Sequence, residues 1–295
     1  MKVGVIGLGR MGEAIVCRLR KGGFEVFGFD PCEEARSQIR ELGATTVESL
    51  SELTEASDII WLMVPAGDTV DKVLDEIKGF LKKDAIIIDG GNSNFKNSVK
   101  RAEQLKELGI GYLDCGTSGG LKGREIGFSL MIGGDHLAYE KAKTVFQAIA
   151  APNGYAQVGP SGAGHYVKMV HNGIEYSLLQ SYAEGFHLLK KNDRYAELNL
   201  ERISRVWSNG SVIRSWILDL AHEVFDEDQE LENVSGEIGE NKTGRWTMDE
   251  TEKQKIPMDL LKRSLEIRQE SRDGKPSFAT KVVAMLRNKF GGHKI

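Results

Sequence analysis

Cysteine is scarce in this chain of 295 residues, and its three cysteines, Cys17, Cys32 and Cys115, are scattered along it. Their spacing matches neither a disulfide framework nor the paired cysteines of a zinc site. We interpret them as reduced thiols, which indicates a cytoplasmic protein.

Long apolar runs and an excess of positive charge are absent as well. No apolar run approaches the length of a membrane-spanning helix. Met1-Lys2 leads into the apolar run Val3–Ile6 without the charged start and the hydrophobic region of a signal peptide. Lysine and arginine number 39 against 43 aspartates and glutamates. Because nucleic-acid binders usually have a basic patch, we expect a small-molecule substrate and no nucleic-acid or membrane partner.

The first half of the chain alternates β-rich runs with amphipathic helical segments such as residues 13–21. That alternation is typical of a mostly parallel sheet covered by helices. We predict a dinucleotide-binding domain over residues 1–162, completed by a helix at about 136–150. The predicted strands are residues 3–6, 25–29, 59–64, 85–89, 112–113 and 129–132.

After Gly164 the β pattern ends and helical periodicity follows, interrupted by a turn-rich, charged stretch at 232–247. The predicted fold class is therefore α/β: an N-terminal Rossmann-type, doubly wound, mostly parallel sheet followed by an all-α C-terminal domain for substrate binding and oligomerisation. The first helix is long, and such helices often cross a domain boundary or a subunit interface. The second domain covers residues 163–295, with helices at 163–191, 198–207, 212–225, 258–270 and 277–288.

A glycine-rich motif follows the first predicted strand and opens the first helix. In that context the glycines permit a tight turn and a close approach of the backbone to a pyrophosphate, whose charge faces a helix N-terminus. The motif therefore predicts a dinucleotide cofactor. Its residues are Gly7, Leu8, Gly9, Arg10, Met11 and Gly12.

Asp30 ends the second predicted strand, where an acidic side chain can accept hydrogen bonds from both ribose hydroxyls of NAD. The same carboxylate would repel the 2'-phosphate of NADP. Pro31 and Cys32 supply no cation to offset this repulsion, although Arg36 could approach from one turn later. We therefore predict NAD rather than NADP.

One face of the long predicted helix is polar and combines a base, an acid and three hydrogen-bonding groups at helical spacing. We expect this face to line an active site, rather than to be merely solvated, and the opposite apolar arc to pack. The polar face consists of Lys168, His171, Asn172, Glu175 and Tyr176, and the apolar arc of Val167, Val170, Ile174 and Leu178.

Four further segments complete a pattern along the chain: Asp89-Gly-Gly-Asn-Ser93, Cys115-Gly-Thr-Ser-Gly-Gly120, Lys242-Thr-Gly-Arg-Trp246 and Arg287-Asn-Lys-Phe-Gly-Gly-His293. In this order, from Gly7 to His293, the chain resembles the decarboxylating 6-phosphogluconate dehydrogenases. The helix with Lys168 and Glu175 is the most specific part, because related β-hydroxyacid dehydrogenases lack the glutamate and the tyrosine that follow the lysine. The chain is similar to the short form of the family, which has no duplicated helical domain.

The resemblance implies oxidation and decarboxylation of 6-phosphogluconate by NAD, a pentose phosphate pathway reaction also used in gluconate utilization. It implies that Lys168 is the base, that Glu175 is the acid and that Arg268 binds the phosphate. The loop before the Thr-Gly-basic-Trp motif is one residue shorter here, so either Asn241 or Lys242 is the substrate contact. The other substrate contacts implied are Asn92, Ser118, Gly119, Gly120, His171, Asn172 and Tyr176, and the cofactor contacts are the glycine-rich motif, Asp30, Val64, Pro65, Ala66 and Asn92.

The chain departs from the family pattern at the cofactor. Asp30-Pro31-Cys32 replaces the basic and hydroxyl residues that hold a 2'-phosphate in many members, and Pro65 stands where a lysine is common. At the other end, Arg287 and His293 match a tail pair that in the family reaches into the neighbouring subunit's site. The resemblance thus implies a homodimer, or a dimer of dimers, whose tail completes the neighbouring site.

Other interpretations stay open for these residues. Asn92 and Ser118 are also typical turn formers, and His171 with Glu175 has the spacing of a metal-binding pair. Lys168 would place a cation beside such a metal and no third ligand is evident, so we predict no metal. Two other functions remain possible: a β-hydroxyacid dehydrogenase that does not decarboxylate, and a noncatalytic NAD-sensing oligomer.

Overall fold

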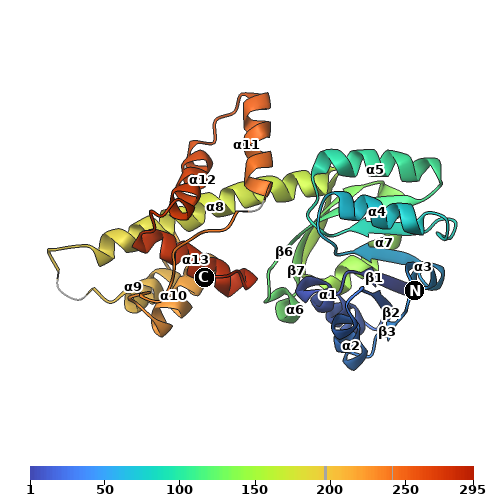
Figure 1. Cartoon of the computed structure of the whole chain (residues 1–295), viewed down its shortest axis with the longest axis horizontal. Helices are drawn as coiled ribbons and strands as arrows, with labels where there is room; N and C mark the ends of the chain where they lie inside the picture. Colours follow the sequence, from blue (N-terminus) through green and yellow to red (C-terminus); the bar gives the residue numbers. More distant parts are fainter. Residues whose placement is uncertain (196–197, 241) are drawn as a thin grey trace. The chain divides into compact units, whose positions relative to one another are not determined.

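The structure, a computed structural model, describes residues 1–195, 198–240 and 242–295. Contacts within the chain divide it into two compact units, Met1–Met169 and Val170–Ile295. The division falls inside helix α8 (Ala163–Lys190), which contributes residues to both units (Figure 1). The predicted domain boundary, between residues 162 and 163, lies at the start of this helix.

The first unit is built on one sheet of eight strands in the order β3-β2-β1-β4-β5-β6-β7-β8. Neighbouring strands are parallel, except that β7 runs antiparallel to β6. The strand order reverses between β1 and β4, and such a switch point is where open α/β sheets bind ligands. The strands are β1 Lys2–Ile6, β2 Glu25–Phe29, β3 Thr45–Thr46, β4 Ile59–Leu62, β5 Ile86–Asp89, β6 Gly111–Ser118, β7 Phe128–Gly134 and β8 Ala150–Gly159.

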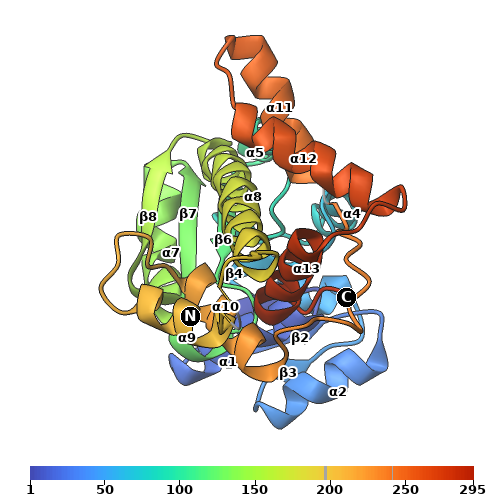
Figure 2. The same ribbon diagram turned by 90° about the vertical axis from the view of Figure 1, so that its left-hand side faces the viewer.

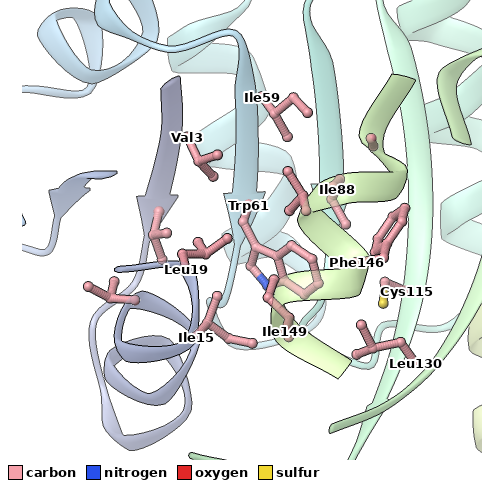
Figure 3. Packing of buried hydrophobic residues seen from close by; sticks show 14 of the residues in the cluster. Val3, Ile15, Leu19, Ile59, Trp61, Ile88, Cys115, Leu130, Phe146 and Ile149 are labelled. Carbon is pink, nitrogen blue, oxygen red and sulfur yellow. The ribbon is translucent and has the colours of Figure 1, made fainter. Parts of the chain in front are cut away.

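Helices cover both faces of this sheet. Side chains alternate between faces along each strand, so Trp61 points into one hydrophobic cluster and Leu62 into another. On one face Trp61 meets Phe146 of α7 edge to face, with ring centroids 6.1 Å apart (Figure 3). The helices on this face include α1 (Arg10–Lys21), α2 (Glu33–Glu41) and α7 (His136–Ile149), and those on the other are α3 (Leu50–Ala56), α4 (Asp68–Ile77) and α5 (Phe95–Glu107).

Two strands differ from the prediction. β6 extends through Gly116 to Ser118, which the sequence pattern suggested was loop, because these residues pair antiparallel with β7. β8 was not predicted at all: it contains Pro152 and the positive-φ residue Asn153, which resemble a turn, and it pairs only with β7 at the end of the sheet (Figure 2). The short helix α6 (Gly123–Ile126) lies between β6 and β7 in the chain.

The described secondary structure of the second unit is entirely helical, which confirms the predicted fold class. Its core includes Phe186 of α8 and Phe225 of α10, whose ring centroids are 4.7 Å apart. Helices α11 and α12 contact each other. No helix among the described residues has the length and apolarity needed to span a membrane. The helices after α8 are α9 Leu200–Ser208, α10 Trp216–Glu227, α11 Lys242–Gln254, α12 Asp259–Arg272 and α13 Phe278–Gly291.

Two predictions about the helical unit were wrong. Residues 242–247 belong to helix α11 and not to a turn-rich stretch. On α8 the apolar arc does not supply the packing side, since Ile174 is 53% exposed and Leu178 42%, whereas Lys168 and Tyr176 of the polar face are only 6% and 4% exposed. Gly173 lies on the packed side of α8, since a Cβ on it would lie 3.1 Å from Thr247 of α11 and 3.2 Å from Leu261 of α12.

Candidate active site

A cavity of about 730 Å³ lies in the first unit at the switch point of the sheet. Most of the predicted cofactor residues line it, but Leu8 and Ala66 do not. The Leu8 side chain belongs to the hydrophobic core, where it is 1% exposed. The predicted residues that line the cavity are Gly7, Gly9, Arg10, Met11, Gly12, Asp30, Val64, Pro65 and Asn92.

The glycines of the motif keep the backbone close to this cavity. A Cβ on Gly12 would lie 1.9 Å from the carbonyl oxygen of Gly7, which itself has a φ of +90°. A Cβ on Gly9 would meet nothing within 4 Å, so at this position the backbone borders open space. Helix α1 then begins at Arg10 and directs its N-terminus to the cavity. This cradle fits a pyrophosphate group.

Asp30 is fixed by the turn around it. Its Oδ2 accepts a hydrogen bond from the Leu8 N–H at 2.8 Å, and its Oδ1 accepts one from the Cys32 N–H at 2.9 Å. Arg36 donates to the Asp30 carbonyl oxygen at 2.7 Å and forms an ion pair with Glu33 at 2.6 Å. The cation that could have bound a 2'-phosphate is therefore already engaged by an acidic neighbour.

Sequence reasoning missed one wall of the cavity. Thr69, Val73 and Glu76 of α4 line it. Their spacing of four and three residues places them on one helical face. Glu76 makes no hydrogen bond or ion pair with any residue that the structure describes. The signal was the amphipathic pattern of α4, which packing on the sheet explains equally well.

Asn92 lies at the cavity in a left-handed conformation, with φ of +56°. Its Nδ2 donates to the Thr117 carbonyl oxygen at 3.1 Å, and its Oδ1 accepts from the Thr117 N–H at 2.9 Å. The amide thus joins the end of β5 to the end of β6. Ser118, Gly119 and Gly120 follow directly, and both glycines have positive φ.

Lys168 is placed by the contact between α8 and β6. A Cβ on Gly116 would lie 2.4 Å from the Cβ of Lys168. Asp114, on the same strand, accepts hydrogen bonds from the N–H groups of Gly162 at 2.6 Å and His165 at 2.8 Å, so its carboxylate caps the start of α8. The base predicted from the sequence is therefore buried and held by two features of one strand.

The other polar residues of α8 follow within the next two turns. His171 Nδ1 lies 3.8 Å from Glu175 Oε2 and 3.2 Å from Asn172 Oδ1. The Glu175 side chain is 22% exposed. The described residues include no group of three potential metal ligands, so no third potential ligand joins His171 and Glu175 there.

Two buried arginines lie in the second unit. The Arg268 guanidinium is 3.5 Å from the centroid of the Tyr176 ring, and its two terminal nitrogens have no hydrogen-bond partner among the described residues. Burial, together with the positive charge of nearby Arg287, lowers the pKa of Arg268 to about 10. Burial likewise lowers the pKa of Arg287. Two buried cations, one without hydrogen-bond acceptors among the described residues, have the charge and the donors to bind an anion.

The remaining predicted substrate residues belong to the second unit as well. Lys242 is the exposed first residue of α11, two residues before Gly244, whose added Cβ would lie 2.9 Å from the Tyr176 ring. Asn241 lies outside the described residues. His293 is exposed beyond the end of α13, whereas Arg287 is buried within that helix.

Family models match nearly the whole chain. Residues 2–162 match the NAD binding domain of 6-phosphogluconate dehydrogenase, and residues 164–289 match the 6-phosphogluconate dehydrogenase C-terminal domain. The chain belongs to the 6-phosphogluconate dehydrogenase family. The family resemblance inferred from the motifs is thereby confirmed, and the protein is an oxidoreductase with an NAD-binding domain.

Individual relatives agree with this assignment to the 6-phosphogluconate dehydrogenase family. The chain is 46% identical to an NAD(+)-dependent, decarboxylating 6-phosphogluconate dehydrogenase of Haloferax volcanii, over 100% of this chain and 98% of that protein. The solved 6-phosphogluconate dehydrogenase of Plasmodium falciparum is 28% identical with a TM-score of 0.84, over 93% of this chain and 63% of that chain. A 3-hydroxyisobutyrate dehydrogenase of Salmonella typhimurium, 20% identical, shares the fold with a TM-score of 0.78 over 96% and 99% of the two chains.

Proposed function

We propose that this protein oxidises and decarboxylates 6-phosphogluconate with NAD, giving ribulose 5-phosphate, carbon dioxide and NADH. The observation that supports this most directly is α8, on which a buried lysine and a partly exposed glutamate are followed by Tyr176 beside Arg268. A base, an acid and an anion-binding group are thus connected through one helix. An extended phosphorylated sugar acid needs all three.

Lys168 acts as the base. In its neutral form it takes the proton from the C3 hydroxyl while NAD, when bound, accepts the hydride that leaves C3. The product is a β-keto acid, whose carboxylate departs as carbon dioxide while the electron pair flows toward the new carbonyl. Lys168, now protonated, stabilises the oxygen anion that develops there. Gly116 lies against the Cβ of Lys168, so strand β6 fixes where this side chain leaves the helix.

Glu175 acts as the acid that protonates C1 after carbon dioxide has left. It lies seven residues after Lys168 on the same helix, which is about 10 Å along the axis. The two side chains can therefore address different atoms of one substrate. This glutamate has no evident use in a dehydrogenase that does not decarboxylate.

Arg268 and Arg287 bind the phosphate of the substrate. A phosphate dianion would give the unpartnered nitrogens of Arg268 the acceptors they lack, and charge-assisted hydrogen bonds of this kind are strong. The phosphate then orients the sugar acid remotely from the reacting carbons. Lys242 is the candidate third cation, since α11 packs Gly244 against Tyr176.

NAD is the cofactor. The support is the double hydrogen bonding that fixes Asp30, together with the ion pair of Arg36 with Glu33. The cavity is also lined by Val64, Pro65 and Asn92. The proposed ligands of the sugar acid are Asn92, Ser118, Gly119, Gly120, His171, Asn172 and Tyr176.

The test is NADH formation from 6-phosphogluconate, followed spectrophotometrically, with carbon dioxide captured in parallel. We expect one carbon dioxide for each NADH. NADH without carbon dioxide would indicate the dehydrogenase that does not decarboxylate, and NAD binding without turnover would indicate a noncatalytic sensor. Gluconate, which lacks the phosphate, is the matched control and should react far more weakly because Arg268 and Arg287 gain nothing from it.

A further inference from the structure

Arg101 of α5 is one of the most deeply buried charged side chains of the first unit, at 2% exposure, and it does not line the cofactor cavity. Its Nε donates to Asp71 Oδ1 at 2.7 Å, and its Nη2 donates to Asp71 Oδ2 at 3.0 Å, a bidentate pair. Nη2 also donates to the Gly67 carbonyl oxygen at 3.0 Å. Nη1 donates to Asp89 Oδ2 at 3.4 Å.

Two of these acceptors, Gly67 and Asp89, belong to different loops that both reach the cavity, whereas Asp71 lies in α4. Gly67 ends the segment after β4 in which Val64 and Pro65 line the cavity. Asp89 ends β5 and begins the segment with Gly90, Gly91 and Asn92, which line it too. One guanidinium therefore spans the β4 loop (residues 63–67) and the β5 loop (residues 89–93).

Asp89 connects Arg101 to the β5 loop through hydrogen bonds. It is fully buried, and its oxygens accept hydrogen bonds from the Gly91 N–H at 3.0 Å, the Ser93 hydroxyl at 2.7 Å and the Tyr112 hydroxyl at 3.0 Å. Arg101 is the one cation among the side chains that hydrogen-bond to Asp89 in the described structure. Since a buried carboxylate needs charge compensation, removing Arg101 would leave Asp89 with neutral donors only.

The conformation of the β4 loop also depends on this contact. Gly67 has φ of +107°, a conformation that L side chains rarely adopt, and its carbonyl points at Arg101. Asp71, one turn into α4, forms an ion pair with the same guanidinium. Arg101 thus holds both the end of the β4 loop and the start of the helix that lines the far wall of the cavity.

We propose that Arg101 is a positioning residue for the cofactor, which keeps the β4 and β5 loops at the separation that NAD requires. It acts through Gly67 and Asp89 and not by touching the cofactor. The inference rests on the proposed NAD-dependent oxidation, because it assigns the cavity to that cofactor. Lysine cannot replace arginine here, since a single ammonium lacks the planar fork that reaches acceptors on three residues in fixed directions.

The test compares Arg101→Lys with Arg18→Lys in the full-length protein. Arg18 is a matched control in the same unit: it donates to the carbonyl oxygens of Ala148, Glu125 and Ala150 at 3.2–3.3 Å and does not line the cavity. Both variants lose a multiply bonded guanidinium, so both should melt at lower temperature. We expect kcat/KM for NAD, per folded protein, to fall about tenfold or more in Arg101→Lys, because small misplacements of a bound reactant are costly. In Arg18→Lys it should stay within about twofold of the unmodified protein.

Asp71→Asn gives a second, graded measurement. Asp71 is half exposed, and the hydrogen bond from Arg101 holds the pKa of its carboxyl below the usual value. The Asn variant should lose less kcat/KM than Arg101→Lys, and the double variant should lose less than the product of the two, as expected for residues that act through one contact. Equal losses in Arg101→Lys and Arg18→Lys, or independent losses in the double variant, would overturn the proposal.

Direct NADH binding separates this proposal from the proposed function. If the unmodified protein fails to oxidise 6-phosphogluconate, the proposed function fails, while NADH affinity measured by fluorescence still tests Arg101. We expect the Kd for NADH to rise by about fivefold or more in Arg101→Lys and to remain unchanged in Arg18→Lys. Unchanged NADH affinity in Arg101→Lys together with unchanged kcat/KM would refute the positioning role.

Discussion

In the proposed reaction, cofactor choice depends on the residue Asp30, an acidic side chain that lines the cavity. We expect the unmodified protein to prefer NAD, and the double substitution Asp30→Ala, Cys32→Arg to shift the kcat/KM ratio toward NADP by about tenfold or more. The change removes a repulsive charge and adds a cation for the 2'-phosphate. A hydrogen bond to a charged group contributes about 1.5–3 kcal/mol, and 1.4 kcal/mol is a factor of ten.

Two single variants are controls for this cofactor prediction. Asp30→Asn removes the charge but keeps an acceptor for only one of the two N–H groups of Leu8 and Cys32, so it should shift the ratio and loosen the turn in part. Cys32→Arg alone should shift the ratio less, since Asp30 still repels the phosphate. An NADP preference in the unmodified protein would show that this assignment is wrong.

In the proposed mechanism, Glu175 is the residue that distinguishes decarboxylating chemistry from simple alcohol oxidation. We expect Glu175→Gln to bind NAD and 6-phosphogluconate but to lose kcat by about 10²-fold or more, the usual size of a lost general acid. Exchange of solvent deuterium into C1 of ribulose 5-phosphate should fall in parallel, because the same carboxyl exchanges that proton.

The matched control for Glu175 lies on the same helix. Glu184 of α8 is exposed and accepts a hydrogen bond from Gln180 at 2.8 Å. Glu184→Gln makes the same chemical change away from the polar face of the site and should leave kcat unchanged. Turnover and exchange near the unmodified rate in Glu175→Gln would require another acid.

At the scale of elements, the position of Lys168 depends on how closely α8 approaches β6. Gly116→Ala would place a methyl carbon 2.4 Å from the Lys168 Cβ, so the helix or the strand must shift. We expect kcat to fall by about 10²-fold, because a displacement of about 1 Å at a catalytic group can have that effect. Thermal unfolding should show a loss of about 1–3 kcal/mol, typical of overpacking.

Gly4→Ala is the control for this displacement. An added Cβ on Gly4 would lie 2.5 Å from the end of the Leu53 side chain, so the added methyl crowds β1 against α3 and not β6 against α8. Its unfolding temperature should also fall, while kcat, corrected for folded protein, stays unchanged. A normal kcat in Gly116→Ala would mean that α8 adjusts without moving the Lys168 amine.

At the scale of the whole molecule, the exposed arc of α8 supports the proposal of a homo-oligomer. Val167, Ile174, Leu178 and Leu188 are 37–75% exposed. A row of apolar side chains along a long helix is typical of a surface that another subunit covers. We therefore keep the homodimer, or dimer of dimers, as the proposed assembly.

The burial of Arg287 sharpens the proposal that the tail completes a neighbouring site. Arg287 lies within α13, and its charge lowers the pKa of Arg268 of its own chain. His293 lies beyond the helix and is exposed. We therefore expect only His293 to serve the neighbouring subunit. Mixing inactive Lys168→Ala with His293→Ala protein should restore activity through hybrid dimers, and mixing Lys168→Ala with Arg287→Ala protein should not.

Subunit exchange in both of these mixtures is verified by mass spectrometry. Rescue in both would mean that the whole C-terminal segment crosses to the neighbour. Rescue in neither would mean that each chain forms its own site from its own residues.

Local patterns determined much of this protein before any tertiary contact was known. The glycine-rich motif between a strand and a helix requires a nucleotide-binding turn, since few other conformations fit glycines so spaced. Helical periodicity alone places Lys168 and Glu175 on one face of a helix. These features depend on neighbours in the chain, and for that reason the Rossmann-type sheet and the helical unit could be predicted.

Only the tertiary structure decided the features that depend on distant residues. Strand β8 and the extension of β6 exist because β7 pairs with both of them, and the start of α11 packs on Tyr176 of α8. The buried side of α8 was reversed relative to the prediction, because hydrophobicity alone does not specify which face a partner covers. Arg101 joins Gly67, Asp71 and Asp89 across three elements. No local pattern in the sequence encodes such a contact, since it arises only when strands and helices far apart in the chain come together.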